Sequence, residues 1–307
     1  MKPTLLITGA GPNGVTGRLI KQRLRGEYTL LTPSSRELDL TDSAQVDEYF
    51  AANRIDYVIH SALSAPSRGL DNTSVGDEVE RNLRMYFNLT KHSGKFQKMF
   101  YFGSGAEFDK STPIVGATEE DFGNRIPKDK YGFEKYVMSL HAAKSDNIYE
   151  IRLFGTINPY EPYIKNVVSN LCAKAVKGLP LTLNRDCRFS FVDIDDAIDF
   201  ISYGITNKLN HHVYNMVGHT LTLSDLRKEI AEMASTKSEI PPFRQEGLNN
   251  EYTGDNSRML DEFNHITPLR DSLSKVLLRI NEIRDSINPA SIDARWNTAK
   301  GIGMKGG

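Results

Sequence analysis

Long apolar runs, cysteine and an excess of either charge are all scarce in this sequence. No stretch reaches the roughly 18 consecutive apolar residues of a transmembrane helix, and the Met-Lys-Pro start is too polar for a signal peptide. Two cysteines cannot build a disulfide framework, and neither they nor the seven histidines show metal-ligand spacing. The 38 basic and 39 acidic side chains nearly cancel, which gives no electrostatic basis for binding nucleic acid or an anionic membrane. We therefore expect a cytoplasmic protein without a metal site.

A tyrosine and a lysine four residues apart, Tyr131 and Lys135, are the first positive signal. On a helix this spacing puts both side chains on one face, where the ammonium favours the phenolate and lowers the pKa of the tyrosine. Tyr131 is thereby a candidate acid and base. Ser104 follows the apolar run Met99–Phe102, a predicted buried strand, and its hydroxyl is placed to hold a carbonyl oxygen. The same spacing also occurs by chance in many helices, so the neighbouring motifs matter.

A glycine-rich loop lies near the start of the chain. Thr4–Thr8 predicts a strand and residues 18–24 have helical spacing; between them stand Gly9, Gly11, Gly14 and Gly17. The last two fit the second half of a dinucleotide-binding loop, whereas Gly9 is two residues further away than usual, which indicates an insertion at Pro12-Asn13. In this context the loop predicts a pyrophosphate site at a helix N-terminus, with a purely structural turn as the alternative.

The second predicted strand, Tyr28–Thr32, ends without a carboxylate and leads into Ser35 and Arg36. An acidic residue there would bind a ribose 2′-hydroxyl, whereas hydroxyls and an arginine suit a 2′-phosphate. This favours NADP, with NAD possible, because Arg36 is equally compatible with a solvated loop. Predicted helices over 43–53 and 77–93 flank a buried strand over 56–62. Such alternation predicts an α/β fold with a doubly wound parallel sheet.

Several motifs occur in a fixed order along the chain: the glycine loop, Asp39-Leu40, His60-Ser61-Ala62, Asn82, Ser104, Tyr131-x-x-x-Lys135 and Arg152-Leu153-Phe154. In order and spacing they resemble the extended short-chain dehydrogenase/reductase family, of NAD-dependent epimerase/dehydratase type, whose members act on nucleotide sugars. The resemblance extends over roughly residues 3–280. Residues 35–60 look most like the GDP-fucose synthases and dTDP-4-dehydrorhamnose reductases. The resemblance to the family implies a Rossmann domain followed by a smaller C-terminal substrate-binding lobe.

The resemblance also implies roles for individual residues. Tyr131 would donate a proton to the carbonyl oxygen, Lys135 would lower its pKa and hold the nicotinamide ribose, and Ser104 would bind the substrate oxygen. The implied cofactor contacts are Gly9, Gly11, Asn13, Gly14, Val15, Ser35, Arg36, Asp39, Leu40, Ser61, Ala62, Leu63, Tyr131, Lys135 and Phe154. The implied nucleotide-sugar contacts are Ser104, Gly105, Asn158, Arg188 and Arg258. A homodimer through helices near 77–93 and 131–145 is expected on the same basis.

The residues after Ser104 narrow the reaction. Similar dehydratases carry an Asp-Glu pair directly after the catalytic hydroxyl, where this chain has Gly105 and Ala106. Glu107 lies one residue beyond the position of the dehydratase glutamate. At the end of a strand, this shift would point its side chain to the opposite face of the sheet. The similar GDP-fucose synthases epimerise with a cysteine at the position of Ala106 and a histidine in a later helix. The corresponding helix here, residues 163–177, has no histidine, and Cys172 fits a buried apolar position better than a catalytic one.

Simple hydride transfer remains. We expect NADPH-dependent reduction of a 4-keto group on a nucleotide-activated 6-deoxy sugar, with Tyr131 as proton donor. Two alternatives stay open: a nucleotide-sugar 4-epimerase with tightly bound NAD, and a dinucleotide-binding protein without catalytic activity.

The second half of the chain departs from the family pattern in two places. Gly155 stands where asparagine is usual and Asn158 where glycine is, and Phe189 occupies the place of a diphosphate-binding arginine, so Arg188 is the nearest candidate. The Asp195-Asp196 pair predicts a helix start rather than an acid pair. Further expectations are a helix cap at Ser224 and a short strand over Leu179–Leu183.

The expected domain limits follow from these segments. Residues 1–155 are expected to form the dinucleotide-binding domain, with 188–213 returning to it. Residues 156–187 and 214–287 are expected to form the substrate lobe, and 288–307 a tail.

Overall fold

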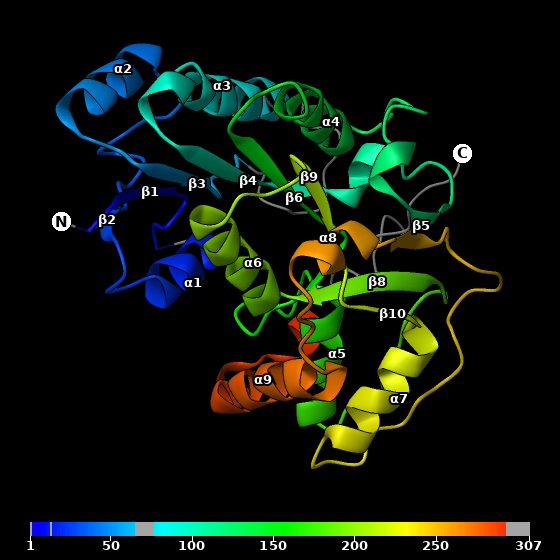
Figure 1. Cartoon of the computed structure of the whole chain (residues 1–307). Coiled ribbons are helices and arrows are strands. Elements are labelled where there is room, and N and C mark those ends of the chain that lie inside the picture. The colour runs from blue at the N-terminus through cyan, green and yellow to red at the C-terminus, as the bar shows by residue number, and fades with distance from the viewer. Residues whose placement is uncertain (1, 13, 65–76, 293–307) are drawn as a thin grey trace.

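The computed structural model describes all residues except 1, 13, 65–76 and 293–307 (Figure 1). The strands are β1 (Thr4–Thr8), β2 (Thr29–Leu31), β3 (Tyr57–His60), β4 (Lys98–Ser104), β5 (Ile114–Ala117), β6 (Ile148–Leu153), β7 (Gly155–Ile157), β8 (Arg188–Asp193), β9 (Val213–Met216), β10 (His219–Thr222) and β11 (Tyr252–Gly254). The helices are α1 (Val15–Arg23), α2 (Ser43–Ala52), α3 (Glu78–Thr90), α4 (Lys130–Ala142), α5 (Val167–Val176), α6 (Ile194–Thr206), α7 (Leu223–Met233), α8 (Ser257–Glu262), α9 (Leu269–Glu282) and α10 (Pro289–Ile292). Short 3₁₀ turns are η1 (Ser93–Lys95), η2 (Gly105–Phe108), η3 (Glu119–Asp121) and η4 (Arg284–Ser286).

The main sheet has six strands in the order β2-β1-β3-β4-β6-β9, and every neighbouring pair is parallel. From β1 the chain moves to β2 on one side and then to β3 on the other, so the strand order reverses at β1. In open α/β sheets, ligands bind beyond the carboxyl ends of the strands at such a reversal. Gly9 and Ser61, which directly follow β1 and β3, flank this point.

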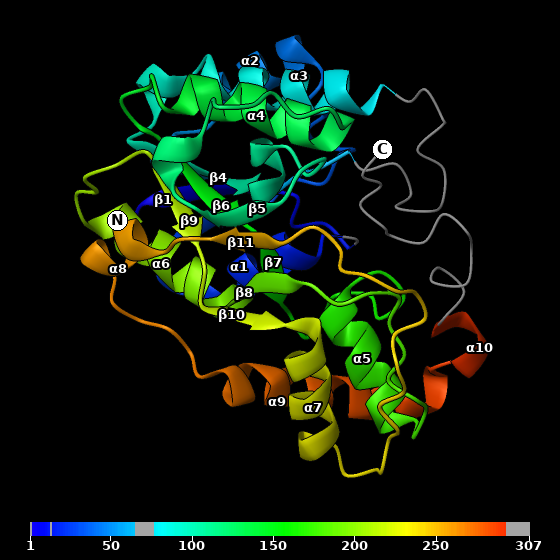
Figure 2. The same cartoon turned by 90° about the vertical axis from the view of Figure 1, so that its right-hand side faces the viewer.

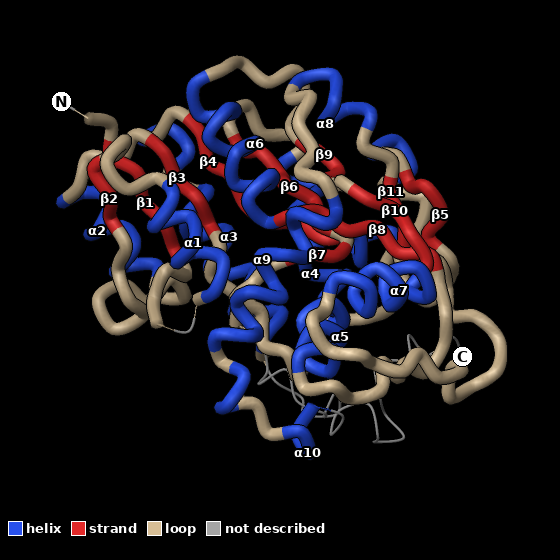
Figure 3. The backbone as a smooth tube through the Cα atoms, turned by 90° about the horizontal axis from the view of Figure 1, so that it is seen from below, coloured by secondary structure: helices blue, strands red, loops and turns tan. Residues whose placement is uncertain are grey.

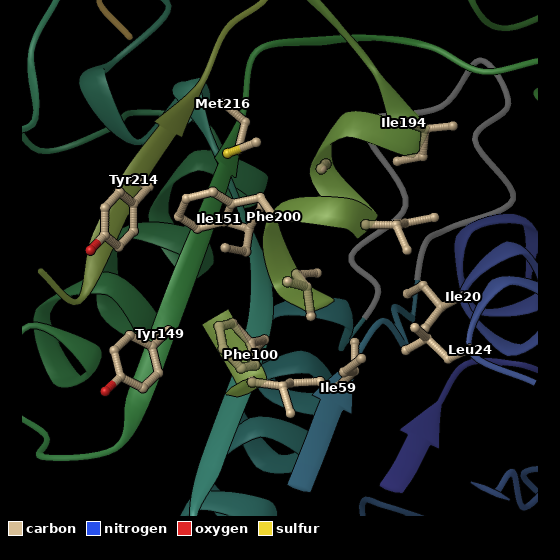
Figure 4. Close-up of a cluster of buried hydrophobic side chains, with 14 of the residues drawn as sticks. Ile20, Leu24, Ile59, Phe100, Tyr149, Ile151, Ile194, Phe200, Tyr214 and Met216 are labelled. Carbon is tan, nitrogen blue, oxygen red and sulfur yellow. The ribbon is translucent and has the colours of Figure 1, made fainter. Parts of the chain in front are cut away.

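Side chains of the main sheet alternate between two cores. Leu5 and Ile7 of β1 join the core formed with α1 and α6, whereas Leu6 between them faces the core formed with α2, α3 and α4. Figure 1 shows the resulting three layers, with α2, α3 and α4 over one face of the sheet and α1 and α6 over the other. Figure 4 shows Phe100 and Phe200 within the α6 side of this packing. The fold is thus the predicted α/β sheet with helices on both faces.

A second sheet forms beside the first, in the order β10-β8-β11-β5, with β7 paired to β8. This second sheet joins segments that are far apart in the chain. For example, β5 (Ile114–Ala117) pairs with β11 (Tyr252–Gly254). Helices α5, α7 and α9 share a separate apolar core below it, as Figure 2 shows. Seen from below in Figure 3, the strands of this sheet lie to one side of the main sheet. The carboxyl end of β4 faces this second sheet, since Ser104 touches Tyr252 of β11.

Some local expectations are confirmed and others are wrong. The Asp195-Asp196 pair lies in the first turn of α6, as predicted, with Asp193 as the cap that accepts from the Asp195 nitrogen. Helix α7 is capped by Thr222, not Ser224, because Thr222 accepts from the nitrogen three residues on. Residues 179–183 pair with no strand and run as irregular extended chain.

The segments that were expected to form the two domains contribute strands to both sheets. β8 pairs in the second sheet although residues 188–213 were expected in the first unit, while α6 does pack on the main sheet. β9 completes the main sheet, and β5 belongs to the second sheet. The first residues of the expected tail form α10 instead, and Ile292 is buried with its carbonyl accepting from Asn170.

Neither a membrane span nor a metal cluster is seen in the part of the chain that the structure describes. There, no helix is both long and apolar enough to cross a bilayer. Within the same residues, no three potential ligands among His, Cys, Asp and Glu lie together. Both cysteines are buried and unpaired.

Candidate active site

The glycine loop packs its backbone against itself and against the chain after β3. Gly9 has a φ of +74°, and a Cβ on it would lie 2.6 Å from the Ala62 nitrogen. A Cβ on Gly14 would lie 1.7 Å from the Gly9 carbonyl oxygen, and one on Gly17 would lie 2.5 Å from the same atom. Only glycine fits at these three positions. The loop therefore has the side-chain-free backbone that a pyrophosphate needs for close approach.

Helix α1 begins directly after this loop, at Val15. Its N-cap is Gly14, which offers no side-chain cap to the N–H groups of the first turn. Those groups and the positive end of the helix dipole point toward the carboxyl edge of the sheet, as in other phosphate sites. Gly11 closes the turn by accepting from the Gly14 nitrogen at 2.9 Å. Asn13, a further predicted contact, lies outside the described residues.

Thr8 ties the end of β1 to the chain after β3. Its hydroxyl lies 2.8 Å from His60 Nδ1 and 3.4 Å from the Ala62 nitrogen, and its carbonyl oxygen accepts from the Ser61 hydroxyl at 2.6 Å. Burial lowers the pKa of His60 to about 3, so the ring is neutral and structural. These contacts hold Ser61 and Ala62 at the strand-order reversal, and half-buried Leu63 follows them.

The turn after β2 was expected to contain no carboxylate, but the structure places one there. Ser35 and Arg36 are exposed there, as a phosphate contact requires. However, the side chain of Glu37 folds back so that Oε2 accepts from the Ser34 nitrogen at 2.7 Å. A carboxylate therefore lies at the end of β2 although none is adjacent in sequence. This feature is compatible with a ribose hydroxyl as well as with a phosphate held by Arg36.

Asp39 and Leu40, the other predicted adenosine contacts, are rigidly placed. The Asp39 carboxylate accepts from the Thr41 hydroxyl at 2.7 Å and from its nitrogen at 2.9 Å, and these bonds lower the pKa of Asp39. Leu40 is buried, and its carbonyl oxygen accepts from Asn88 of α3.

Ser104 ends β4 and at the same time caps η2. Its Oγ accepts from the Ala106 nitrogen at 3.2 Å, and its own nitrogen donates to Glu107 at 2.7 Å. Because a lone pair of Oγ is used by the backbone, the hydroxyl proton is left to donate elsewhere. This is the geometry required of a residue that holds a substrate oxygen.

Helix α4 carries Tyr131 and Lys135 in its first two turns, as their spacing predicts. Asp129 caps the helix by accepting from the Gly132 nitrogen at 3.0 Å. The buried Lys135 ammonium donates to the Phe102 carbonyl oxygen at 2.7 Å, whereas Tyr131 is 37% exposed and open to a ligand. The lysine thus connects the helix directly to the strand that ends in the serine.

Two further side chains near these residues were missed from the sequence. Tyr252 of β11 places its hydroxyl 3.4 Å from Ser104 Oγ, and burial, with a smaller effect of Tyr131, raises the pKa of Tyr252. The Lys110 ammonium lies 5.7 Å from the ring centre of Tyr131 and 3.4 Å from Asp129. Neither residue has a local sequence signal, because only the folded chain brings them to the site.

The catalytic candidates converge at the carboxyl edge of the main sheet. The start of α4 packs on η2 so closely that a Cβ on Gly132 would lie 2.6 Å from the Ala106 carbonyl oxygen. The Lys135 ammonium bonds to β4 two residues before Ser104. A hydroxyl donor, a phenol and an ammonium are thereby carried by elements that pack together at the carboxyl edge of the main sheet, a set of groups that suits proton transfer to a carbonyl oxygen.

The predicted substrate contacts have mixed surroundings. Gly105 packs against Phe154, a predicted cofactor contact that is itself buried among aromatic rings. Asn158 is buried, and within the described residues its Nδ2 has no hydrogen-bond partner. Arg188 is exposed, 3.9 Å from Glu251. The roles of these residues in substrate binding stay predictions.

Arg258 already has protein partners. Its guanidinium pairs with Glu120, lies 3.8 Å from Glu119, and donates to the Val213 carbonyl oxygen at 3.1 Å. These contacts fix α8 to the edge of the main sheet. Its predicted contact with a nucleotide is not tested by them.

Two groups considered for other reactions are buried. The Glu107 carboxylate is inaccessible and pairs with Arg152 at 2.9 Å, so it points away from a ligand above Ser104, as expected. Burial raises the pKa of the Cys172 thiol well above its ordinary value, which fits the predicted apolar role.

Asn82 links α3, α4 and the chain after β3. Its side-chain oxygen accepts from the Ser64 nitrogen at 2.7 Å, and its nitrogen donates to the Ser64 carbonyl oxygen and to Glu134. Glu134 adjoins Lys135 in sequence, and burial raises the pKa of this carboxyl to about 7. The helix bearing the catalytic pair is therefore tied to the loop at the strand-order reversal.

The chain is similar to known proteins in sequence and in fold. The family model described as NAD dependent epimerase/dehydratase family matches residues 5–216. The chain is similar to GDP-L-colitose synthase of Yersinia pseudotuberculosis, 23% identical over 258 residues (76% of this chain, 82% of that protein). It is also similar to GDP-L-fucose synthase of Escherichia coli K12, 30% identical over 229 residues (72% and 70%).

A solved structure has the same fold. The NADP-bound GDP-mannoheptose C4 reductase of Campylobacter jejuni superposes with a TM-score of 0.75 at 17% identity, covering 91% of this chain and 98% of that one. At this level of identity the likeness supports the architecture alone.

Replacing Gly14 with alanine tests the glycine loop. The new Cβ would occupy the space of the Gly9 carbonyl oxygen, so the loop must open and the affinity for NADPH should fall at least about tenfold. Gly94→Ala is the matched control, because a Cβ there meets nothing within 4 Å. Fluorescence titration with NADPH measures the dissociation constant of both variants. An unchanged dissociation constant in Gly14→Ala would contradict the assignment.

The raised pKa of Glu134 predicts a pH effect on stability. Its pKa lies near 7 in the folded protein against an ordinary 4.5, so the folded state binds the proton more tightly than the unfolded state does. The free energy of unfolding should therefore fall as pH rises from about 4.5 to 7. Glu134→Gln should flatten this dependence, and Glu48→Gln on exposed α2 should retain it. Urea unfolding at several pH values gives the free energy of unfolding of each variant. An equal dependence of this free energy on pH in the two variants would contradict the prediction.

Proposed function

The chain belongs to the NAD-dependent epimerase/dehydratase family, and on that premise we propose that it is an NADPH-dependent reductase of a 4-keto group on a nucleotide-activated 6-deoxy sugar. Two observations support the proposal: Lys135 bonds to the Phe102 carbonyl oxygen, two residues before Ser104, and the start of α4, which bears Tyr131, packs on η2, which Ser104 caps. A protein that only binds a dinucleotide has no need of these three groups together.

The residues present fit a dinucleotide. Its pyrophosphate would rest on the backbone of the glycine loop and the N-terminus of α1, where Gly14 and Gly17 let the loop and the helix pack closely against the Gly9 carbonyl oxygen. Asp39 and Leu40 would flank the adenine. Ser35 and Arg36 would hold a 2′-phosphate.

Each catalytic side chain has a distinct task. When bound, the reduced nicotinamide supplies the hydride. Ser104 donates its hydroxyl proton in a hydrogen bond to the sugar carbonyl oxygen, because its lone pair is already held by the Ala106 nitrogen. Tyr131 gives its phenolic proton to the same oxygen, which becomes the product hydroxyl. The Lys135 ammonium stabilises the phenolate that remains.

The choice of reduction rests on what surrounds the serine. Gly105 and Ala106 supply neither an acid nor a base, and Cys172 is fully buried in the α5 core. Dehydration, and epimerisation of the kind that the similar GDP-fucose synthases perform, both need such groups. The names of the two relatives and of the solved structure refer to GDP-linked sugars, so we propose a GDP-linked substrate.

A second candidate is a 4-epimerase that holds NAD tightly. The observation in its favour is the Glu37 carboxylate folded back to the end of β2, where it suits a ribose 2′-hydroxyl. The two functions differ in cofactor use, because an epimerase regenerates its cofactor whereas a reductase consumes it.

Incubation with NADPH and a panel of GDP-, CDP- and dTDP-linked 4-keto-6-deoxy sugars tests the function. We expect stoichiometric loss of NADPH absorbance with the GDP-linked sugar. Tyr131→Phe should lower kcat at least about a thousandfold while NADPH still binds, because the proton donor is lost. Tyr136→Phe, one turn away beside Phe122, should stay within about threefold.

Other results would point elsewhere. Protein that purifies with bound NAD and interconverts sugars without added cofactor would establish the epimerase. Full activity in Tyr131→Phe would rule out the assigned proton donor.

We also propose a homodimer through α3 and α4. These helices expose large apolar side chains on their outer faces: Phe87 is 38% exposed, Phe133 41% and Leu140 47%. Exposed large apolar side chains on neighbouring helices are typical of a protein interface.

Leu140→Lys should therefore convert the dimer to a monomer, because a charge would be buried at the centre of the interface. Leu278→Lys on α9 is the matched control, since Leu278 is 68% exposed on another face. Light scattering coupled to size-exclusion chromatography gives the mass of each. A dimer that survives Leu140→Lys would exclude this interface.

A further inference from the structure

A fully buried cluster of charged side chains lies directly beneath Ser104. It consists of Glu107 of η2 with Glu150 and Arg152 of β6, all with no exposed surface. Arg152 Nε lies 2.9 Å from Glu107 Oε2 and 3.0 Å from Glu150 Oε1. Removing charges from water costs free energy, so such a cluster must be closely paired. One guanidinium is shared here between two carboxylates.

Arg152 also joins the two elements that carry the catalytic groups. Its NH2 group donates to Ser139 Oγ at 3.0 Å, one helical turn beyond Lys135 on α4. Its other terminal nitrogen donates to Asn215 of β9 at 3.3 Å. The guanidinium lies 4.8 Å from the ring centre of Phe108 and 5.1 Å from that of Phe122. Strand, helix and η2 are thus fixed to one planar group.

Only one of the two carboxylates reaches the serine. Glu107 Oε1 accepts from the Ser104 nitrogen at 2.7 Å, which completes the cap in which Ser104 Oγ accepts from Ala106. Glu150 instead accepts from the Tyr101 hydroxyl at 3.0 Å. The two carboxyl groups share full burial and the arginine partner, but burial and the neighbouring Glu150 raise the pKa of Glu107 well above its ordinary value, and only Glu107 contacts the serine.

We propose that Glu107 is a positioning residue for the reduction: held by Arg152, it fixes the backbone and rotamer of Ser104 relative to Tyr131 and Lys135. The proposal rests on the proposed function, in which Ser104 holds the sugar oxygen. Glu107 exchanges no proton with the substrate, because its carboxylate is wholly enclosed.

The excess carboxylate in the cluster makes a matched test possible. Glu107→Met and Glu150→Met each replace a carboxylate with an uncharged side chain of similar shape. Each variant leaves Arg152 with one carboxylate partner, so both should fold. Only Glu107→Met loses the acceptor for the Ser104 nitrogen. Glu107→Gln should restore it, because an amide oxygen can accept the same bond.

Kinetics with the reducible sugar supply the first measurement. We expect Glu107→Met to lower kcat at least about tenfold with the dissociation constant of NADPH unchanged, Glu107→Gln to recover most of the loss, and Glu150→Met to stay within about threefold. In a Ser104→Ala background, Glu107→Met should cause no further loss, because its effect passes through the serine. Equal losses in the two methionine variants, or multiplying effects with Ser104→Ala, would overturn the proposal.

Amide hydrogen exchange at Ser104 supplies a measurement that needs no substrate. Its rate should rise at least about tenfold in Glu107→Met and remain near the wild-type rate in Glu150→Met. If the wild type consumes no NADPH with any sugar, the proposed function fails while the exchange rates still decide whether Glu107 fixes the serine. Unchanged exchange in Glu107→Met would reject the positioning role by itself.

Discussion

All six strands of the main sheet run parallel, and this constraint places every functional feature at one edge. A parallel strand ends where its neighbours end, because each crossover returns the chain to the opposite edge before the next strand begins. The glycine loop after β1, Ser61 after β3 and Ser104 at the end of β4 therefore lie along one edge, although they are spread over some hundred residues. Helix α4 then needs only to lie against β4, as the bond from Lys135 to the Phe102 carbonyl oxygen ensures.

The parts of the fold that could be predicted are those with short-range signals. Tyr131 and Lys135 are one turn apart, and α4 forms over them. The β1 run and its glycines occupy consecutive positions, and the strand and loop lie where expected. Alternating strands and helices then specify a doubly wound sheet, because few connections between parallel strands are sterically favourable. Each of these signals is contained within about twenty residues.

The features that could not be predicted depend on contacts across long separations or on close local competition. Tyr252 touches Ser104 from 148 positions away, through a second sheet whose strands are short and weakly patterned. Glu107 binds Arg152 from 45 positions away. At the start of α7, Thr222 and Ser224 are both good caps, and the backbone direction after β10 selects the first. The apolar run over 179–183 has strand composition, but its backbone bonds to Glu239 and Arg244 lie outside any strand of the described residues.

The choice among the reactions of this family is determined by aromatic packing rather than by the catalytic trio. A Cβ on Gly105 would lie 2.5 Å from the Phe154 ring and 2.9 Å from the Tyr252 hydroxyl. An acid at that position, as similar dehydratases have, would require both rings to move. Phe154, Phe108 and Tyr252 form one buried cluster with the β5 strand, so such a movement would disturb the join between the two sheets. The same packing that brings Tyr252 to the serine therefore leaves no room at position 105 for the acid that similar dehydratases carry there.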